Sequence, residues 1–207
     1  MDFSDIVIQR LEESGYSYSD ITELLHLDFE ERLSQGIIMS ASKMSVSEVQ
    51  DKAQNRIVLV AYRRTTNELI SIAMTQFRLD EYNILFGDEE YKGIHPNYKR
   101  HGVGSLLEHA LQNLAIESGA SYLICTIALQ AKSSIRYHLS NGFFKWCCIS
   151  FPDTDYYSIV FRKQLKPHKK WDNVFYRTLH FYFSFCHTVL TKRRDGTIRR
   201  IMQYFQL

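Results

Sequence analysis

The sequence lacks the features that would place the chain in a membrane, outside the cell or on nucleic acid. No stretch approaches the roughly 18 uninterrupted apolar residues of a membrane span. The first residues lack the basic and then apolar run of a signal peptide. The four cysteines form neither a CxxC pair nor a zinc spacing, and the net charge of +2 is too small by itself to indicate nucleic-acid binding. We therefore expect a cytoplasmic protein with no metal site and no nucleic-acid partner.

What is present is the composition of a folded globular chain. Hydrophobic residues make up 45% of the 207 residues and charged residues 23%, which argues against disorder. This length suits one domain with an appendage. We expect a domain over residues 1–164 and a C-terminal extension over residues 165–207, where aromatic and basic residues gather.

Apolar patterning predicts strands first, and then strands that alternate with helices, which implies a mixed α/β sheet. Strands are expected at residues 6–11, 57–62, 69–77, 89–94, 122–127, 146–151 and 156–162. The second and third of these form an antiparallel hairpin, and the last two form a closing hairpin. Helices are expected from Ser19 or Asp20 to Gly36, from Ser45 or Ser47 onward, from Val103 to just before Gly119, and over residues 133–139.

The stretch with the clearest chemistry is a basic loop over residues 94–105, Ile-His-Pro-Asn-Tyr-Lys-Arg-His-Gly-Val-Gly-Ser. It leads from a strand into the first turn of the helix with the most regular apolar pattern. Unpaired N–H groups and the positive end of the dipole make such a turn an anion site. Gly102 and Gly104 would let a diphosphate approach the backbone closely, and Lys99 and Arg100 add positive charge.

Two other nucleotide-binding motifs are absent from this loop. Leu107 stands where a GxGxxG motif would have its third glycine, and the sequence contains no GxxxxGK[ST]. A lone G-x-G is equally typical of a tight strand-to-helix turn that binds nothing, so this alternative stays open.

Three segments resemble the GCN5-related N-acetyltransferase (GNAT) superfamily, in its order and at its separations. Residues 99–104, Lys-Arg-His-Gly-Val-Gly, resemble the [Q/R]-x-x-G-x-[G/A] pyrophosphate loop. Residues 94–96 resemble the V-x-P at the end of the family's fourth strand, and residues 134–143 resemble its A-x-x-x-Y-x-x-x-G-F segment. The likeness covers roughly residues 6–163. It implies the GNAT fold, a mixed and mostly antiparallel sheet flanked by helices.

The resemblance also implies an enzyme that transfers acetyl from acetyl-CoA, its co-substrate, to an amine by direct attack, without a metal. The expected acceptor is the amine of a small molecule or an amino sugar. Alternatives are a protein N-terminus or lysine, and a module that binds coenzyme A without turnover. A splayed strand near Gly93–His95 is implied to offer N–H groups to the acetyl carbonyl. The residues implied to bind the cofactor are Ile94, His95, Lys99, Arg100, His101, Gly102, Val103, Gly104, Ser105 and Ser134.

The candidate general acid departs from the family pattern. His138 stands four residues before the Gly of the Gly-Phe pair, where the family usually carries a tyrosine. An imidazolium is populated near neutral pH and could protonate the departing thiolate. Tyr137 is the alternative acid, and a helix residue without a catalytic role is the alternative reading of His138. Ala131, where the family often has Asn, keeps the non-catalytic alternative open.

The candidate general bases are acidic residues near the start of the fourth expected sheet strand. Asp88 and Glu90 would share one face by strand alternation. They could accept the acceptor's proton directly or through water. The alternative is an acidic turn in solvent.

The C-terminal extension has a helical pattern with an aromatic face. Residues 171–190 contain no Gly or Pro, although Leu179, Phe181, Phe183 and Phe185 also alternate as in a strand. Such a face must be covered. We favour burial against the domain's own core or against a second subunit of a homodimer. A membrane surface is the alternative, prompted by the flanking Lys and Arg residues. The residues expected on this face are Trp171, Val174, Phe175, Tyr182, Phe185 and Val189.

Overall fold

The computed structural model describes residues 3–34, 40–151, 156–168 and 172–192. The chain divides into two compact units, Met1–Leu123 and Ile124–Leu207. Its architecture is mixed α/β, with mostly antiparallel strands flanked by helices, which confirms the predicted fold class. None of the described helices is long and apolar enough to cross a membrane.

The first unit builds a sheet in which consecutive strands are neighbours. Strands β1, β2, β3 and β4 lie in this order, and each pairs with the next in antiparallel fashion. Its strands are β1 (Ile6–Arg10), β2 (Ile57–Arg63), β3 (Glu68–Leu79), β4 (Leu85–Ile94) and the start of β5 (Tyr122–Ala128). Its helices are α1 (Leu11–Ser14), α2 (Tyr18–Ser34), α3 (Val46–Ala53) and α4 (Val103–Glu117), with short 3-10 turns at Phe3–Asp5, Ser40–Ser42 and Pro96–Tyr98.

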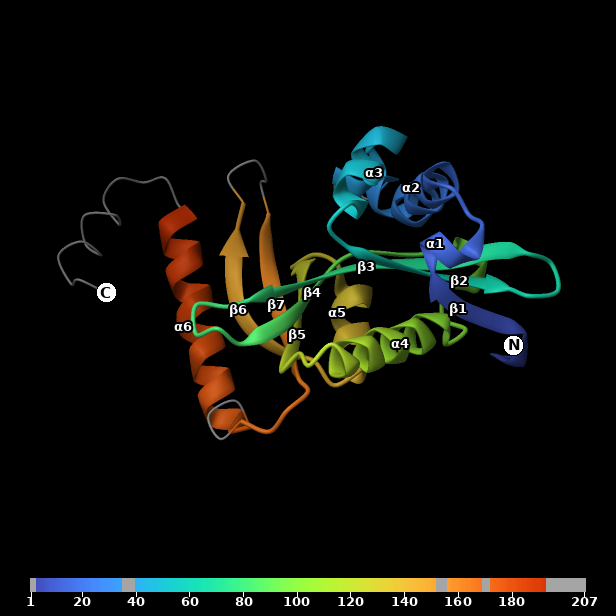
Figure 1. Ribbon diagram of the computed structural model, residues 1–207. Helices are drawn as coiled ribbons and strands as arrows, with labels where there is room; N and C mark the ends of the chain where they lie inside the picture. The colour runs from blue at the N-terminus through green and yellow to red at the C-terminus, as the bar shows by residue number, and fades with distance from the viewer. Residues whose placement is uncertain (1–2, 35–39, 152–155, 169–171, 193–207) are drawn as a thin grey trace. The chain divides into compact units, whose positions relative to one another are not determined.

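Helices cover both faces of this sheet, with α2 and α3 on one side of β2–β4 and α4 on the other (Figure 1). Because side chains alternate along each strand, the strands contribute apolar residues to two cores, one on each face of the sheet. Val60, Ile72 and Met74 pack in the core that includes residues of α2 and α3. Leu59 and Ala73 pack against Leu107 and Leu111 of α4. Because α4 is anchored through this core, its first turn is held in a fixed place at the end of β4.

Local sequence explains where the helices begin and end. Helix α3 starts with a capping box, in which Ser45 and Glu48 satisfy each other's backbone N–H groups. Helix α4 ends just before Gly119, whose left-handed φ of 84° only glycine adopts at no steric cost. Beyond it the N–H of Ala120 donates to the carbonyl of Ala115 at 2.9 Å, which is the longer bond of a Schellman motif.

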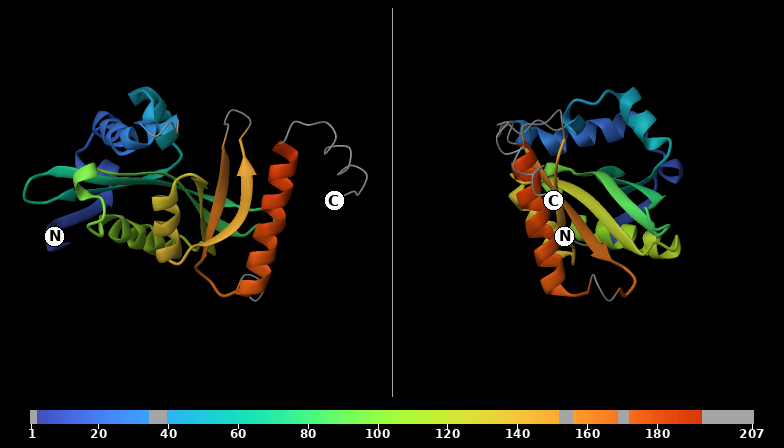
Figure 2. Two further views of the ribbon diagram at one scale, coloured as in Figure 1. Left: turned by 180° about the vertical axis from the view of Figure 1, so that it is seen from behind. Right: turned by 90° about the vertical axis from the view of Figure 1, so that its left-hand side faces the viewer.

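The second unit continues β5 and adds α5 (Lys132–Ser140), β6 (Phe144–Ser150), β7 (Tyr157–Gln164) and α6 (Val174–Lys192). Its strand order is β5-β7-β6, so β6 is an edge strand, and β6 and β7 are antiparallel. Helix α6 lies along β6 in every view (Figures 1 and 2).

The predicted elements are confirmed, with most ends shifted by a few residues. The largest shift is at β4, which begins at Leu85, so the acidic residues lie within the strand and not ahead of it. The sequence does not show that the strand begins at Leu85, because Gly87 interrupts its apolar pattern. A Cβ there would lie 2.6 Å from Leu123 Cδ2, so any larger residue would force the Leu123 side chain to shift. The predicted helix end at Gly36, and Trp171, lie outside the described residues.

Candidate functional site

The loop between β4 and α4 presents the start of a 15-residue helix. Arg100 has a φ of 65° and Gly102 a φ of 86°, so two left-handed residues turn the chain into α4. Gly102 is the N-cap and makes no side-chain cap. The first intrahelical bond runs from the N–H of Leu106 to the carbonyl of Gly102. The first turn of any helix directs N–H groups and the positive dipole end outward. This geometry suits an anionic group.

The charges of this loop differ in where they point. The Lys99 ammonium lies 3.2 Å from Asp28 Oδ1 and 3.1 Å from the Asp28 carbonyl, so it is turned toward α2. Arg100 and His101 are exposed. The positive side chain of this loop that stands in solvent is therefore that of Arg100.

The two glycines of the loop differ in exposure: the backbone is open to solvent at Gly102 and buried at Gly104. Gly102 is exposed, and a Cβ built on it would lie 2.8 Å from Cζ of Phe3. Val103 and Gly104 are buried, while Ser105 is half-buried. Any side chain at position 102 would have to displace the Phe3 ring and adopt a strained backbone.

The end of β4 directs one amide away from β3. The N–H of His95 donates to the carbonyl of Ile70 at 2.9 Å, so it belongs to the ladder with β3. Ile94 stands opposite Ser71 in the adjacent pair. Since successive pairs in an antiparallel ladder alternate, the N–H of Ile94 points to the other edge of β4.

Both predicted bases are held by arginines. Asp88 forms an ion pair with Arg78. Both carboxylate oxygens of Glu90 lie 2.8 Å from one guanidinium nitrogen of Arg56. Each predicted base is therefore already paired with an arginine.

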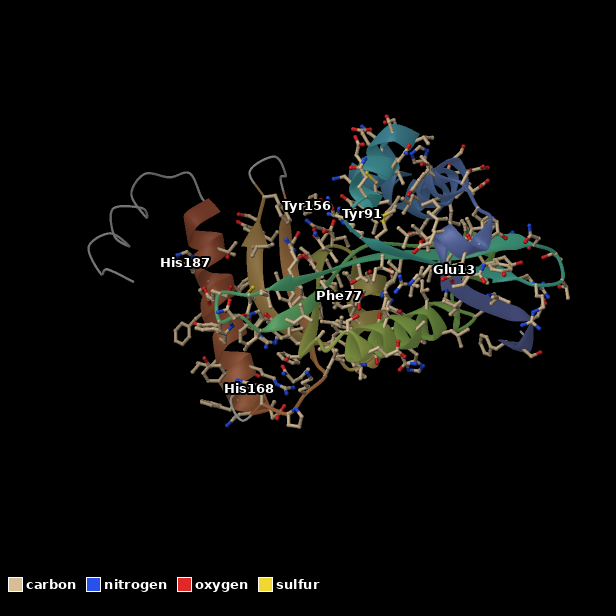
Figure 3. The ribbon with its side chains drawn as sticks, in the orientation of Figure 1. Glu13, Phe77, Tyr91, Tyr156, His168 and His187 are labelled. Atoms are coloured by element: carbon tan, nitrogen blue, oxygen red, sulfur yellow. The ribbon has the colours of Figure 1, made fainter. Side chains whose placement is uncertain are left out.

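The residue between them, Glu89, lies in a buried charge cluster. The pairing of β3 with β4 shifts register between Ala73 and Thr75, and this bulge places Glu89 and Lys92 on the face toward α4. Lys92 Nζ lies 2.9 Å from Glu89 Oε2 and 2.5 Å from Oε2 of Glu108, a residue of α4. Within the same bulge Tyr91 packs in the core of α2 and α3 (Figure 3). The single ammonium of Lys92 therefore forms ion pairs with two buried carboxylates, those of Glu89 and Glu108.

This cluster gives Glu89 an unusual proton affinity. Burial raises the pKa of Glu89 from 4.5 to about 7, against the attraction of Lys92 and with the repulsion of Glu108. Its second oxygen, Oε1, is buried and has no hydrogen-bond partner among the described residues. Glu89 therefore exchanges a proton near neutral pH. The sequence contains one signal of the cluster, since Glu108 is the acidic residue on the otherwise apolar face of α4.

In the second unit, α5 carries the candidate acids. His138 is 6% exposed, and its Nδ1 donates to the carbonyl of Ser134 at 2.8 Å. Because a carbonyl only accepts, Nδ1 carries a proton, and Nε2 is the nitrogen at which the ring gains or loses one. The His138 ring meets Phe143 edge to face, with centroids 5.2 Å apart. Tyr137 and Ser134 are half-buried.

The cysteines of β6 are poor nucleophiles. Burial raises the pKa of the Cys147 thiol to about 11 and raises the pKa of Cys148. Both remain protonated thiols near neutral pH, whereas the thiolate is the reactive form.

No family model and no curated protein matches the chain, but solved structures of acetyltransferases do. One is the ribosomal-protein-S18-alanine N-acetyltransferase of Escherichia coli, with 14% identity and a TM-score of 0.59 over 79% of this chain and 96% of that one. An acetyltransferase of the GNAT family from Streptococcus pneumoniae has 17% identity and a TM-score of 0.55, over 77% of this chain and 98% of that one. The yncA protein of Salmonella typhimurium, solved with its cofactor acetyl-CoA, has 17% identity and a TM-score of 0.59, over 79% of this chain and 96% of that one.

At these identities the likeness shows the fold. It extends over nearly the whole of each solved chain. The chain therefore has the fold of the GCN5-related N-acetyltransferase superfamily.

Proposed function

We propose that the chain is an N-acetyltransferase that uses acetyl-CoA as its co-substrate. The observation that carries this proposal is the loop before α4, where Arg100 and Gly102 turn the chain into an N-terminus with no side-chain cap. Such a terminus binds phosphate groups. The solved structure with acetyl-CoA shares this fold and supports the same cofactor here.

The loop residues fit the diphosphate of such a cofactor. Gly102 places no side chain over the backbone, the exposed Arg100 adds positive charge, and the exposed His101 is a further proposed contact. The Ile94 N–H, on the edge of β4 away from β3, is the proposed donor to the acetyl carbonyl or the pantetheine arm. Ser134 stays a proposed contact from α5. When bound, acetyl-CoA supplies an activated acetyl thioester.

Among the three carboxylates of β4, Glu89 best suits a general base. A base works best when its pKa lies near the operating pH, and the pKa of Glu89 is about 7. Glu90 and Asp88 remain candidates, but each already forms an ion pair with an arginine. We propose His138 as the acid that protonates the leaving thiolate through Nε2, with Tyr137 as the alternative.

The proposed acceptor is the amine of a small molecule or an amino sugar. A protein N-terminus is the second candidate, because a solved structure of this fold is named for the alanine of ribosomal protein S18. For either acceptor the amine attacks the thioester carbon directly. The protonated thiols of Cys147 and Cys148 support a route without an acyl-cysteine.

A panel assay tests this function. Coenzyme A release from acetyl-CoA is followed with small amines, amino sugars and peptides with free N-termini. Release that requires one class of amine supports the proposal and names the class. Tight acetyl-CoA binding without release for any amine would leave only the non-catalytic coenzyme A module.

A further inference from the structure

Helix α6 packs on β6 through its polar side. Ser184 Oγ accepts the N–H of Cys148 at 2.9 Å and donates to its carbonyl at 3.1 Å. Thr188 donates to the same carbonyl at 2.6 Å, and His180 Nδ1 donates to the carbonyl of Trp146 at 2.8 Å. Because β6 is an edge strand, its outer backbone groups need such partners. The inward face of α6 is polar for this reason.

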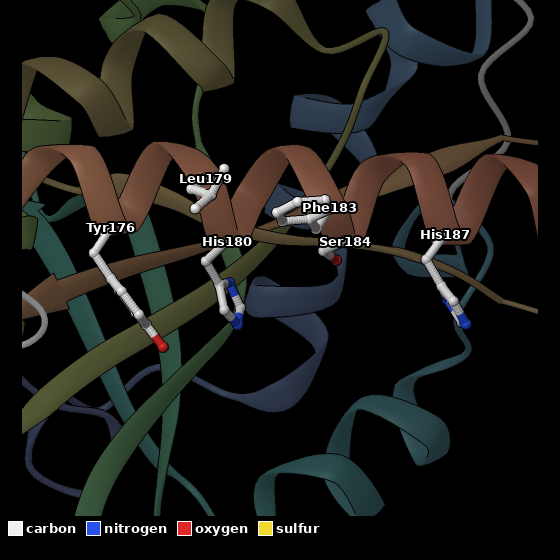
Figure 4. A pocket seen from close by; sticks show the side chains of 6 residues that line it. All are labelled: Tyr176, Leu179, His180, Phe183, Ser184 and His187. Atoms are coloured by element: carbon white, nitrogen blue, oxygen red, sulfur yellow. The ribbon is translucent and has the colours of Figure 1, made fainter. Parts of the chain in front are cut away.

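The apolar side of α6 consequently faces outward. Five apolar residues of this helix are between 41% and 75% exposed, and they form one stripe about three turns long. This outward stripe consists of Val174, Phe175, Leu179, Tyr182 and Phe183. An open hollow of about 410 Å³ adjoins it, with Leu179 and Phe183 among its lining residues (Figure 4). Phe175 and Tyr182, two residues of the expected aromatic face, are therefore not covered by the described part of the chain.

The charge of the chain is concentrated in the same region. Residues 156–207 contain eleven Lys or Arg and only two acidic residues, Asp172 and Asp195. They therefore carry a formal charge of +9, while residues 1–155 carry −7, which together give the net charge of +2. In the sequence, Lys169 and Lys170 come a few residues before the start of α6 at Val174, and Arg193 and Arg194 follow its last residue, Lys192. The outward stripe lies between two cationic segments of the sequence.

These features favour an anionic lipid surface over a second copy of the chain. A second copy would bring its own charge of +9 to the contact. The stripe offers roughly 500 Å² of apolar side chain, while a stable interface buries roughly 800 Å² per partner. A helix with an apolar stripe and basic flanks that cannot span a bilayer can lie in its surface.

We propose that the outward stripe of α6 docks this protein on an anionic membrane surface. The outward stripe enters the headgroup boundary, and the positive charge of residues 156–207 attracts the acidic headgroups. Helix α6 lies parallel to the surface, because the outward stripe runs along the helix. The proposal does not depend on acetyl transfer.

Vesicle co-sedimentation of the full chain tests this inference. The vesicles are phosphatidylcholine alone, and phosphatidylcholine mixed with phosphatidylserine. We expect the chain to sediment with the mixed vesicles only, and to be released as salt rises from about 0.1 M to about 1 M. Replacing Phe175, Tyr182 and Phe183 together with Ser should weaken partition at least about tenfold. Charge reversal by Lys192→Glu, Arg193→Glu and Arg194→Glu should do the same.

A matched control replaces exposed apolar residues elsewhere. Leu79 and Tyr82 are 61% and 72% exposed in the first unit, and Leu79→Ser with Tyr82→Ser should leave vesicle binding unchanged. Thermal melting confirms that each variant is folded. The inference is overturned if the chain stays in the supernatant with both vesicles, or if the triple Ser variant sediments like the parent. It is also overturned, in favour of a second copy, if light scattering shows a dimer that the triple Ser variant abolishes.

Discussion

Phe143 and His138 are joined twice, once through the backbone and once through their rings. The N–H of Phe143 donates to the carbonyl of His138 at 3.0 Å, and the ring centroids are 5.2 Å apart. Between them Gly142 has a φ of 84° and donates to the carbonyl of Leu139. Together these bonds form a Schellman motif with its hydrophobic contact. The Gly-Phe pair therefore fixes the end of α5 and, with it, the place of His138.

The first prediction compares two glycines with the same φ. Gly142→Ala and Gly119→Ala each force alanine into a left-handed φ of 84°, without a close contact below 3.6 Å. Each should lower the free energy of unfolding by about 1 kcal/mol. Only Gly142→Ala should also lower turnover, because it loosens the helix end that holds His138. Denaturant titration and coenzyme A release measure the two effects. Equal turnover in both variants would contradict a link between this helix end and catalysis.

The second prediction concerns the general acid. His138→Ala should reduce turnover by about 10²–10⁴-fold, the usual loss for such a group, and leave acetyl-CoA binding nearly unchanged. His138→Tyr should recover part of the rate and keep it to higher pH, since tyrosine loses its proton later than imidazolium. Tyr137→Phe is the control and should be nearly silent. If Tyr137→Phe abolishes turnover while His138→Ala does not, the acid is Tyr137.

The third prediction is a pH dependence of stability from Glu89. Below about pH 4.5 this carboxyl is protonated in the folded and the unfolded chain. Its folded pKa is raised to about 7, so between these values only the folded chain keeps the proton, and stability falls as pH rises. The fall should reach about 3 kcal/mol near pH 8.

Glu89→Gln should remove this fall, because glutamine does not titrate. Glu90→Gln is the matched control and should retain it. Urea unfolding from pH 4.5 to 8 measures the difference between the parent and each variant. A constant difference between the parent and Glu89→Gln across this range would show that Glu89 titrates normally.

The fourth prediction concerns the loop before α4. Gly102→Ala adds a Cβ where we propose that the diphosphate meets the backbone, and acetyl-CoA should bind at least about tenfold more weakly by calorimetry. The Cβ would also meet Phe3. Phe3→Ala alone should leave affinity unchanged, and combined with Gly102→Ala it should not restore it. Restored affinity in the double variant would assign the loss to the Phe3 clash. Gly15→Ala, at a φ of 77° with nothing within 4 Å, is the control for backbone strain.

Much of the fold could be predicted because local signals agree with it. Alternating apolar residues mark β2 and β3, and helical spacing marks α4 up to Gly119. The loop between β4 and α4 could also be predicted, since its basic residues and glycines lie close together in the sequence. The cofactor and catalytic roles assigned to its neighbours and to α5 remain predictions.

What could not be predicted depends on partners distant in sequence. Lys99 turns to Asp28, 71 residues away, which no local pattern announces. The bulge in β4 puts Glu89 and Lys92 on one face, whereas strict alternation would separate them. Helix α6 turns its polar side inward because that side bonds the backbone groups at the edge of β6. Most surface helices instead turn their apolar side inward.

The measurement that tests the central claim most directly follows the acetyl group itself. The chain is incubated with acetyl-CoA that carries a labelled acetyl group, together with the panel of amines, and every product is weighed by mass spectrometry. We predict one labelled acetyl on an amine for each coenzyme A released, and no label on the protein. Coenzyme A release that no amine accelerates, or label that accumulates on a side chain of the protein, would contradict direct acetyl transfer to an amine.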